Sequence, residues 1–135
     1  MITITNYIQE KLKITKDTKI ISYKYYPKDK DELLKILKDR LSKDSNANLN
    51  DIDTSKITDM ANLFKDLYVF FDIEIGNINV SYWDVSNVKN MNNMFANCSN
   101  FNCDLSNWNV SDKLKYNDIT FYKCDSLKNK PIWYK

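Results

Sequence analysis

Apolar residues in the first third of the chain follow a helical spacing. Over residues 28–43 they recur every three to four positions, and charged residues fill most of the remaining surface. The apolar face consists of Leu33, Leu34, Leu37 and Leu41. Asp29 or Asp31 can cap the start of this segment. The pattern predicts an amphipathic helix that packs on the protein itself. The β-forming residues of positions 19–26 predict a strand before it, which Pro27 ends.

From residue 51 onward the apolar pattern repeats. Residues 53–64 match residues 84–95 at an offset of 31, and a third copy follows at an offset of 25 that becomes 26. A period near 25 residues indicates stacked units, each of which buries its apolar face only against its neighbours. The positions predicted to form this repeat core are Ile57, Met60, Phe64, Trp83, Val85, Val88, Met91, Met94, Phe95, Cys98, Phe101, Trp108, Val110, Leu114, Phe121, Cys124 and Leu127.

These patterns predict an α/β solenoid, with an N-terminal strand–helix cap over residues 1–50 and about three 25-residue units over residues 51–135. Short parallel strands are expected to stack across the units, with helical or irregular segments behind them. The chain has eighteen asparagines and one glycine, and asparagine tolerates the left-handed backbone of tight turns. Asp53, Asp84 and Asp104 recur in these turns and are expected to accept backbone hydrogen bonds, with a calcium-binding turn as the alternative.

The middle copy also carries a family resemblance. Residues 83–107 read WDVSNVKNMNNMFANCSNFNCDLSN, which resembles the repeat of BspA-like, leucine-rich-repeat-type bacterial surface proteins, first grouped as a mycoplasma lipoprotein domain of unknown function. The resemblance covers about residues 19–127. It implies a leucine-rich-repeat-like fold, and many relatives are thought to bind host proteins or matrix. It carries no catalytic residues.

The composition argues against several classes of function. The chain has no histidine, which removes the commonest general base and metal ligand, and its single glycine excludes a phosphate-binding loop. We therefore expect neither an enzyme nor a bound cofactor or metal. No apolar run is long enough for a membrane span or a signal peptide, which predicts a cytoplasmic protein. A net charge of +2 does not call for a nucleic-acid partner.

The three cysteines allow several interpretations. An odd number argues against a closed disulfide framework. Cys98 and Cys124 occupy equivalent repeat positions and are predicted to be small apolar core residues, whereas Cys103 can be exposed. A disulfide or a three-cysteine metal site is the alternative.

An insertion in the first copy is the candidate docking site. Trp83 follows Phe64 by 19 positions, whereas Trp108 follows Phe95 by 13. The six extra residues lie within positions 65–82, and insertions in repeat arrays often form binding loops. The candidate partner-binding residues are Asp66, Tyr68, Phe70, Asp72, Glu74 and Tyr82. The alternative is that residues 67–71 fill the core beside the N-terminal helix.

Two functions follow from these features. The first is a protein-binding module without catalysis, and one form of it is a small intracellular inhibitor from a phage or mobile element that blocks a host defence or other machine. The second is nucleic-acid binding by the basic, Tyr-containing N-terminal region. That region holds Lys11, Lys13, Lys16, Lys19, Lys24, Lys28, Lys30, Tyr23, Tyr25 and Tyr26. The C-terminal residues 131–135 are expected to cap the open end of the array.

Overall fold

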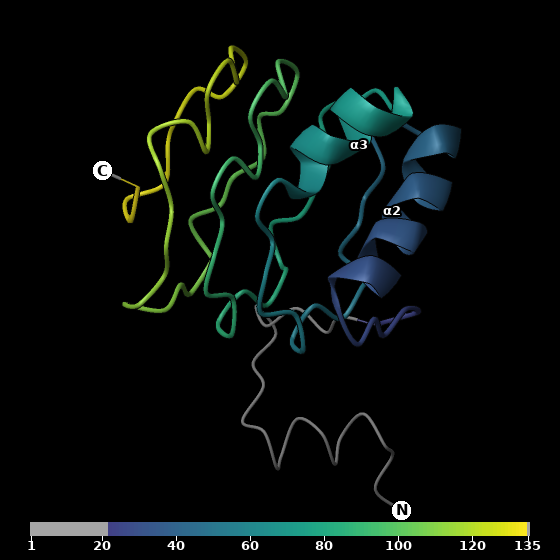
Figure 1. The fold of residues 1–135 in the computed structure, drawn as a ribbon, viewed down its shortest axis with the longest axis horizontal. Coiled ribbons are helices and arrows are strands. Elements are labelled where there is room, and N and C mark those ends of the chain that lie inside the picture. The colour runs from purple at the N-terminus through teal and green to yellow at the C-terminus, as the bar shows by residue number, and fades with distance from the viewer. Residues whose placement is uncertain (1–21, 135) are drawn as a thin grey trace, which may run out of the picture.

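The computed structural model describes residues 22–134. Two helices contact each other at one end of this part of the chain (Figure 1). Helix α2 spans Lys30–Lys43, and the side chain of Asp29 accepts a hydrogen bond from the Glu32 backbone N–H at 2.9 Å. This confirms the predicted helix and its Asp29 cap. Helix α3 spans Leu63–Phe71 and was not foreseen as a helix of this length.

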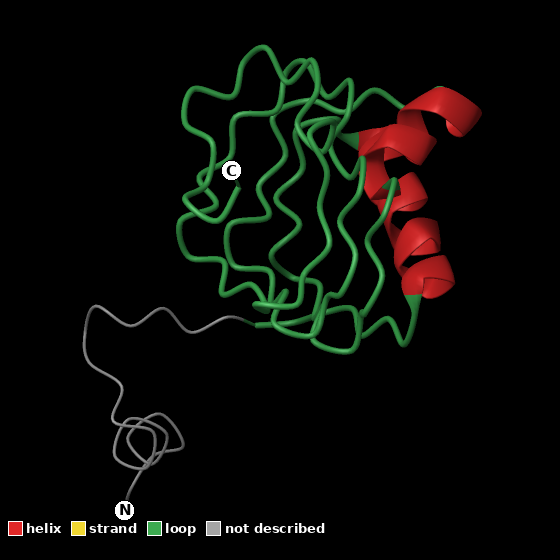
Figure 2. Ribbon diagram, turned by 60° about the vertical axis from the view of Figure 1, so that its left-hand side comes forward, coloured by secondary structure: helices red, strands yellow, loops and turns green. Residues whose placement is uncertain are grey.

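The rest of the described chain consists of loops that run beside one another (Figure 2). The Met60 backbone N–H donates to the Asn90 carbonyl at 2.9 Å, and the Met91 N–H donates to the Lys115 carbonyl at 2.8 Å. Isolated parallel bridges join Asp59 to Asn90 and Asn90 to Lys115. These pairs are separated in sequence by the same distances as the repeat copies, so equivalent segments of successive copies lie side by side.

The predicted fold class, an α/β solenoid with short parallel strands, is wrong. Residues 22–134 contain two helices and isolated bridges, but no strand and no sheet. The predicted strand over 19–26 is absent from its described part, residues 22–26, and residues 19–21 lie outside the described part. Within residues 22–26, Tyr25 forms an isolated parallel bridge with Ile52, and the Lys24 backbone N–H donates to the Asp51 carbonyl at 2.7 Å.

The spacing of the apolar residues explains why strands do not form. In the middle copy the buried residues recur every third position, at Val85, Val88, Met91 and Met94. A strand alternates with a period of two. The Val88 N–H donates to the Val85 carbonyl and the Met94 N–H to the Met91 carbonyl, so the chain turns between one buried residue and the next. Each segment between turns is too short to be a strand.

Aromatic rings form the centre of the core. The Phe95 ring stacks on Phe64, Phe101 and Phe121, with centroid distances of 5.3, 4.3 and 5.4 Å. Trp83 and Trp108 flank this stack, and their indole N–H groups donate to the carbonyls of Leu49 and Val80. Most predicted repeat-core residues are buried, whereas Val110, Leu114 and Leu127 are only partly buried.

Asparagine side chains connect neighbouring copies. The Asn77 N–H donates to the Asn46 side-chain oxygen, Asn102 to Asn77 and Lys128 to Asn102, at 2.8, 3.0 and 3.1 Å. A second row links the amides of Asn62, Asn93 and Asn117. Asn62, Asn93 and Asn97 have φ values of 61°, 61° and 67°, which confirms that asparagine supplies left-handed turns.

Turn aspartates satisfy backbone groups close to them. The carboxylates of Asp53, Asp84 and Asp104 each accept a backbone N–H from the residue two positions later, at 2.9–3.0 Å. The predicted turn role is confirmed. The bonds from Ser106 lower the pKa of Asp104 below its usual value.

Candidate functional site

The insertion of the first copy folds as α3 and continues to Trp83. The helix buries Leu63, Phe64 and Leu67 on its inner side. Its last turn faces outward and exposes Tyr68, Val69, Phe70 and Phe71, with relative accessibilities of 49%, 49%, 72% and 47%. We call these four residues the α3 patch. Isolated exposed apolar residues are ordinary on protein surfaces, whereas a contiguous group marks an interaction site.

The predicted docking residues do not all lie together. Tyr68, Phe70, Asp72 and Glu74 are exposed on or directly after the last turn of α3, and Asp66 is half-buried in its first turn. Tyr82 is separate from the helix. It is half-buried beside Trp83, and its backbone N–H donates to the Asn50 side chain at 2.9 Å.

The alternative prediction, that residues 67–71 fill the core, holds for Leu67 alone. The sequence prediction also missed Val69 and Phe71 as members of the exposed surface. The spacing of the buried residues does not indicate this exposure, because Phe71 lies four residues after the buried Leu67 and so falls on the same side of the helix.

Acidic groups lie at both ends of α3, and Lys65 lies beside Asp66 in its first turn. Asp66 lies in the first turn, Asp72 caps the C-terminal end with a φ of 52°, and the last turn contains no basic residue. The unpaired carbonyls at a helix C-terminus carry a partial negative charge, which the carboxylate of Asp72 reinforces. Lys38 of α2 places its ammonium 3.9 Å from the centre of the Phe71 ring. A hollow of about 490 Å³ separates the ends of the two helices and is bordered by Phe71, Asp72 and Glu74 on the α3 side.

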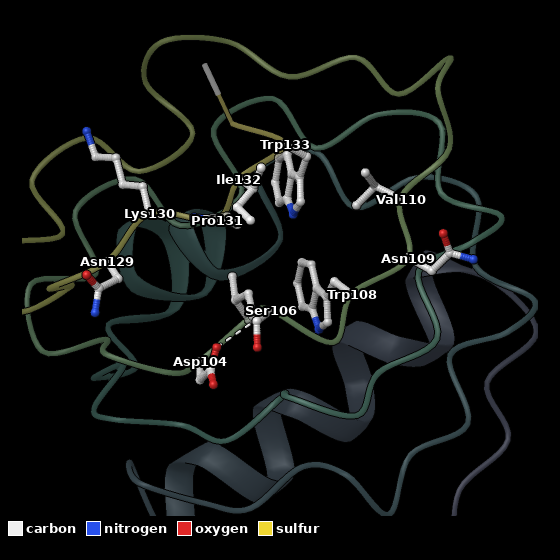
Figure 3. A pocket seen from close by; sticks show the side chains of 11 residues that line it. Asp104, Ser106, Trp108, Asn109, Val110, Asn129, Lys130, Pro131, Ile132 and Trp133 are labelled. Atoms are coloured by element: carbon white, nitrogen blue, oxygen red, sulfur yellow. Dashed lines mark hydrogen bonds between the residues drawn. The ribbon is translucent and has the colours of Figure 1, made fainter.

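A second hollow lies at the opposite, C-terminal end (Figure 3). It has a volume of about 580 Å³, and the rings of Trp108 and Trp133 stack in its wall with centroids 6.5 Å apart. Tyr134 packs edge-on against Phe121, so the C-terminal residues cover part of the aromatic core. Ile132 is 94% exposed at the rim. The buried Trp133 indole N–H has no acceptor among the described residues.

All three cysteines are buried free thiols. Cys98 and Cys124 lie in equivalent turns, and the Cys124 thiol donates to the Phe95 carbonyl at 3.0 Å. Burial raises the pKa of Cys98 and Cys103, and raises that of Cys124 to about 12. Within residues 22–134 no group of three or more cysteine or carboxylate side chains is placed to hold a metal ion.

Residues 34–134 match the family described as "Mycoplasma protein of unknown function, DUF285". The chain belongs to this family. DUF285 is the family of BspA-like mycoplasma repeat proteins, which agrees with the resemblance of the repeat motif. The leucine-rich-repeat geometry that the resemblance implied is not seen, since the described residues form no strands. No curated protein and no solved structure matches the chain.

The DUF285 match begins within α2, so it includes the helix as well as the repeats. The family description names no activity. Neither helix of the described DUF285 chain is long and apolar enough to cross a membrane.

Basic side chains of the predicted nucleic-acid-binding region and of α2 are partly engaged within this DUF285 chain. Lys11, Lys13, Lys16 and Lys19 lie outside the described residues. Lys30 donates to the Ala61 carbonyl, and Arg40 is paired with Asp51 at 2.9 Å while lying over the Tyr25 ring. Burial and the charges of Asp53 and Asp84 raise the pKa of Tyr23. Carboxylates this close to Tyr23 disfavour a phosphate backbone at the same place.

Proposed function

We propose that this protein is a protein-binding module that docks a partner through the α3 patch and performs no catalysis. One observation carries the proposal: the four consecutive outward-facing apolar residues belong to the insertion and not to the stacked core. Aromatic side chains on a rigid support make effective binding centres, because they bury a large area with little loss of conformational freedom.

The buried residues of α3 hold the α3 patch in a fixed position. Leu63, Phe64 and Leu67 are fully buried, and Phe64 stacks on Phe95 and Trp83 of the next copy. The helix is therefore fixed to the aromatic core, and its exposed turn is presented in one orientation. A partner would gain contact area without first ordering the loop that carries it.

The location of the partner is a further part of the proposal. Free buried thiols suit a reducing compartment, which supports the cytoplasmic setting predicted from the sequence. An inhibitor from a phage or mobile element that acts on a host machine remains one form of this proposal.

Cross-linking with matched variants tests docking through the α3 patch. A photo-cross-linker at position 69 in native cells should give a defined adduct, and the variant Phe70→Ser should lose it because the most exposed ring of the patch is removed. The control is Ile132→Ser, which removes an even more exposed apolar side chain at the other end of the molecule. Loss of the adduct in both variants, or in neither, would refute docking through the α3 patch.

A further inference from the structure

The α3 patch combines apolar rings with negative charge, and this combination limits the chemistry of its partner. Phe70 is the most exposed ring, and Asp66 lies four residues before it on the same helical face. Asp72 and Glu74 are both exposed directly after the last turn. Side chains that can neutralise these carboxylates while covering the rings would gain from both contacts.

The patch already shows how it receives a cation. The ammonium of Lys38 lies 3.9 Å from the centre of the Phe71 ring, close enough for a cation–π interaction. The last turn of α3 has no basic residue of its own to balance its C-terminal carbonyls. Lys43 borders the same hollow as Asp72 and Glu74, but it is paired with Asp39 at 2.9 Å, so these two exposed carboxylates can take further positive charge from a partner.

From this charge arrangement we infer that the α3 patch binds a basic amphipathic segment of a protein partner. The inference rests on the proposed docking function and specifies its partner. Apolar side chains of the segment pack on Tyr68, Val69 and Phe70, and its lysines or arginines lie against Asp72, Glu74 and Asp66. An amphipathic helix presents its apolar and basic residues with the required separation. The same carboxylates disfavour an anionic membrane surface as the occupant.

A pair of labelled peptides tests the inference directly. Both contain about 18 residues with leucines along one helical face, and the other face carries either lysines or glutamates. Fluorescence anisotropy with the full chain at about 50 mM salt should show that the lysine peptide binds at least tenfold more tightly than the glutamate peptide. Raising the salt to about 300 mM should weaken the lysine peptide several-fold, because the exposed carboxylates are screened.

Variants separate the charged from the apolar part. The double variant Asp72→Asn, Glu74→Gln should reduce binding of the lysine peptide about fivefold to tenfold, and asparagine preserves the left-handed turn at position 72. The matched control is Asp112→Asn, Asp125→Asn, which removes two exposed carboxylates from the third copy and should leave affinity unchanged.

The outcomes distinguish this inference from the docking function itself. Equal binding of both peptides, lost together in Phe70→Ser, would overturn the preference for basic segments and leave the docking surface in place. Failure of the lysine peptide to bind would also overturn the inference, while the cellular cross-link at position 69 would still decide the proposed function. Equal weakening in both carboxylate variants would show a general charge effect and would count against the assigned site.

Discussion

Two segments of the chain connect equivalent core residues through different structures, and we call residues 64–83 the long route and residues 95–108 the short route. Residues 64–83 and residues 95–108 each lead from a buried phenylalanine to a buried tryptophan. The longer segment passes through α3, whereas the shorter one passes through a series of tight turns. In each segment the backbone N–H of an asparagine donates to the side chain of an earlier asparagine: Asn77 donates to Asn46, and Asn102 donates to Asn77.

The difference shows which contacts the fold requires. Buried residues of the short route recur in the long one, because Ile78 and Val80 occupy the places of Cys103 and Leu105. Leu67 corresponds to Cys98 at the offset of 31, and both are buried, whereas the α3 patch that follows Leu67 is exposed. Stacking of the copies therefore needs the two ends of the insertion, while its exposed turn is available for binding.

The largest expected effect contrasts the aromatic core with the α3 patch. Replacing Phe95 with alanine removes the ring at the centre of the stack and should lower the free energy of unfolding by about 3–5 kcal/mol. Replacing Phe70 with alanine should change it by less than about 0.5 kcal/mol, because that ring is 72% exposed. Urea denaturation followed by tryptophan fluorescence measures both.

A destabilisation by Phe70→Ala as large as that of Phe95→Ala would remove the distinction between the two segments. It would mean that the exposed turn contributes to folding. The α3 patch would then need no partner to explain it.

A smaller effect is expected at Gly76, where the segment after α3 rejoins the stacked copies. Gly76 donates its N–H to the Ser45 carbonyl at 2.8 Å. A Cβ at this position would lie 2.7 Å from the same carbonyl oxygen and 2.3 Å from the Asn46 side-chain oxygen. Gly76→Ala should therefore cost roughly 1–3 kcal/mol, because the two segments must move apart.

Thermal unfolding of Gly76→Ala and of a control, Asn100→Ala, checks this expectation. Asn100 is exposed on the short route, and its replacement should have little effect. An unchanged melting temperature in Gly76→Ala would show that the insertion can shift without disturbing the stack.

The sequence predicted the features that depend on spacing and local chemistry. Helix α2 followed from its leucine period and its Asp29 cap, and the turn roles of asparagine and aspartate followed from their known backbone preferences. The offsets of 31 and 25 between the copies equal the separations of the bridged pairs Asp59–Asn90 and Asn90–Lys115.

The expectation of strands failed because a period near 25 residues indicates stacked units but does not fix the secondary structure within each unit. Val85, Val88, Met91 and Met94 are three positions apart, which fits successive turns and not an alternating strand. Asn46 and Asn50, in the segment after α2, form hydrogen bonds with Asn77 and Asn79. Those bonds join residues about thirty positions apart, and no local pattern identifies such partners.

The smallest predicted effect concerns a left-handed turn. It occurs at Asn97 in the short route, and the equivalent part of the first copy is helical in α3. Asn97 has a φ of 67°, and its equivalent in the third copy, Lys123, has a φ of 58°. Lysine tolerates this backbone less well than asparagine, so Lys123→Asn should raise the free energy of unfolding by about 0.5 kcal/mol. The gain is limited because the lysine ammonium lies 5.5 Å from the Tyr122 ring, a contact that the substitution removes. Urea denaturation should show no gain in the control Lys113→Asn, whose backbone is not left-handed. A loss of stability in Lys123→Asn would mean that the contact of the lysine with Tyr122 outweighs the preference of asparagine for this turn.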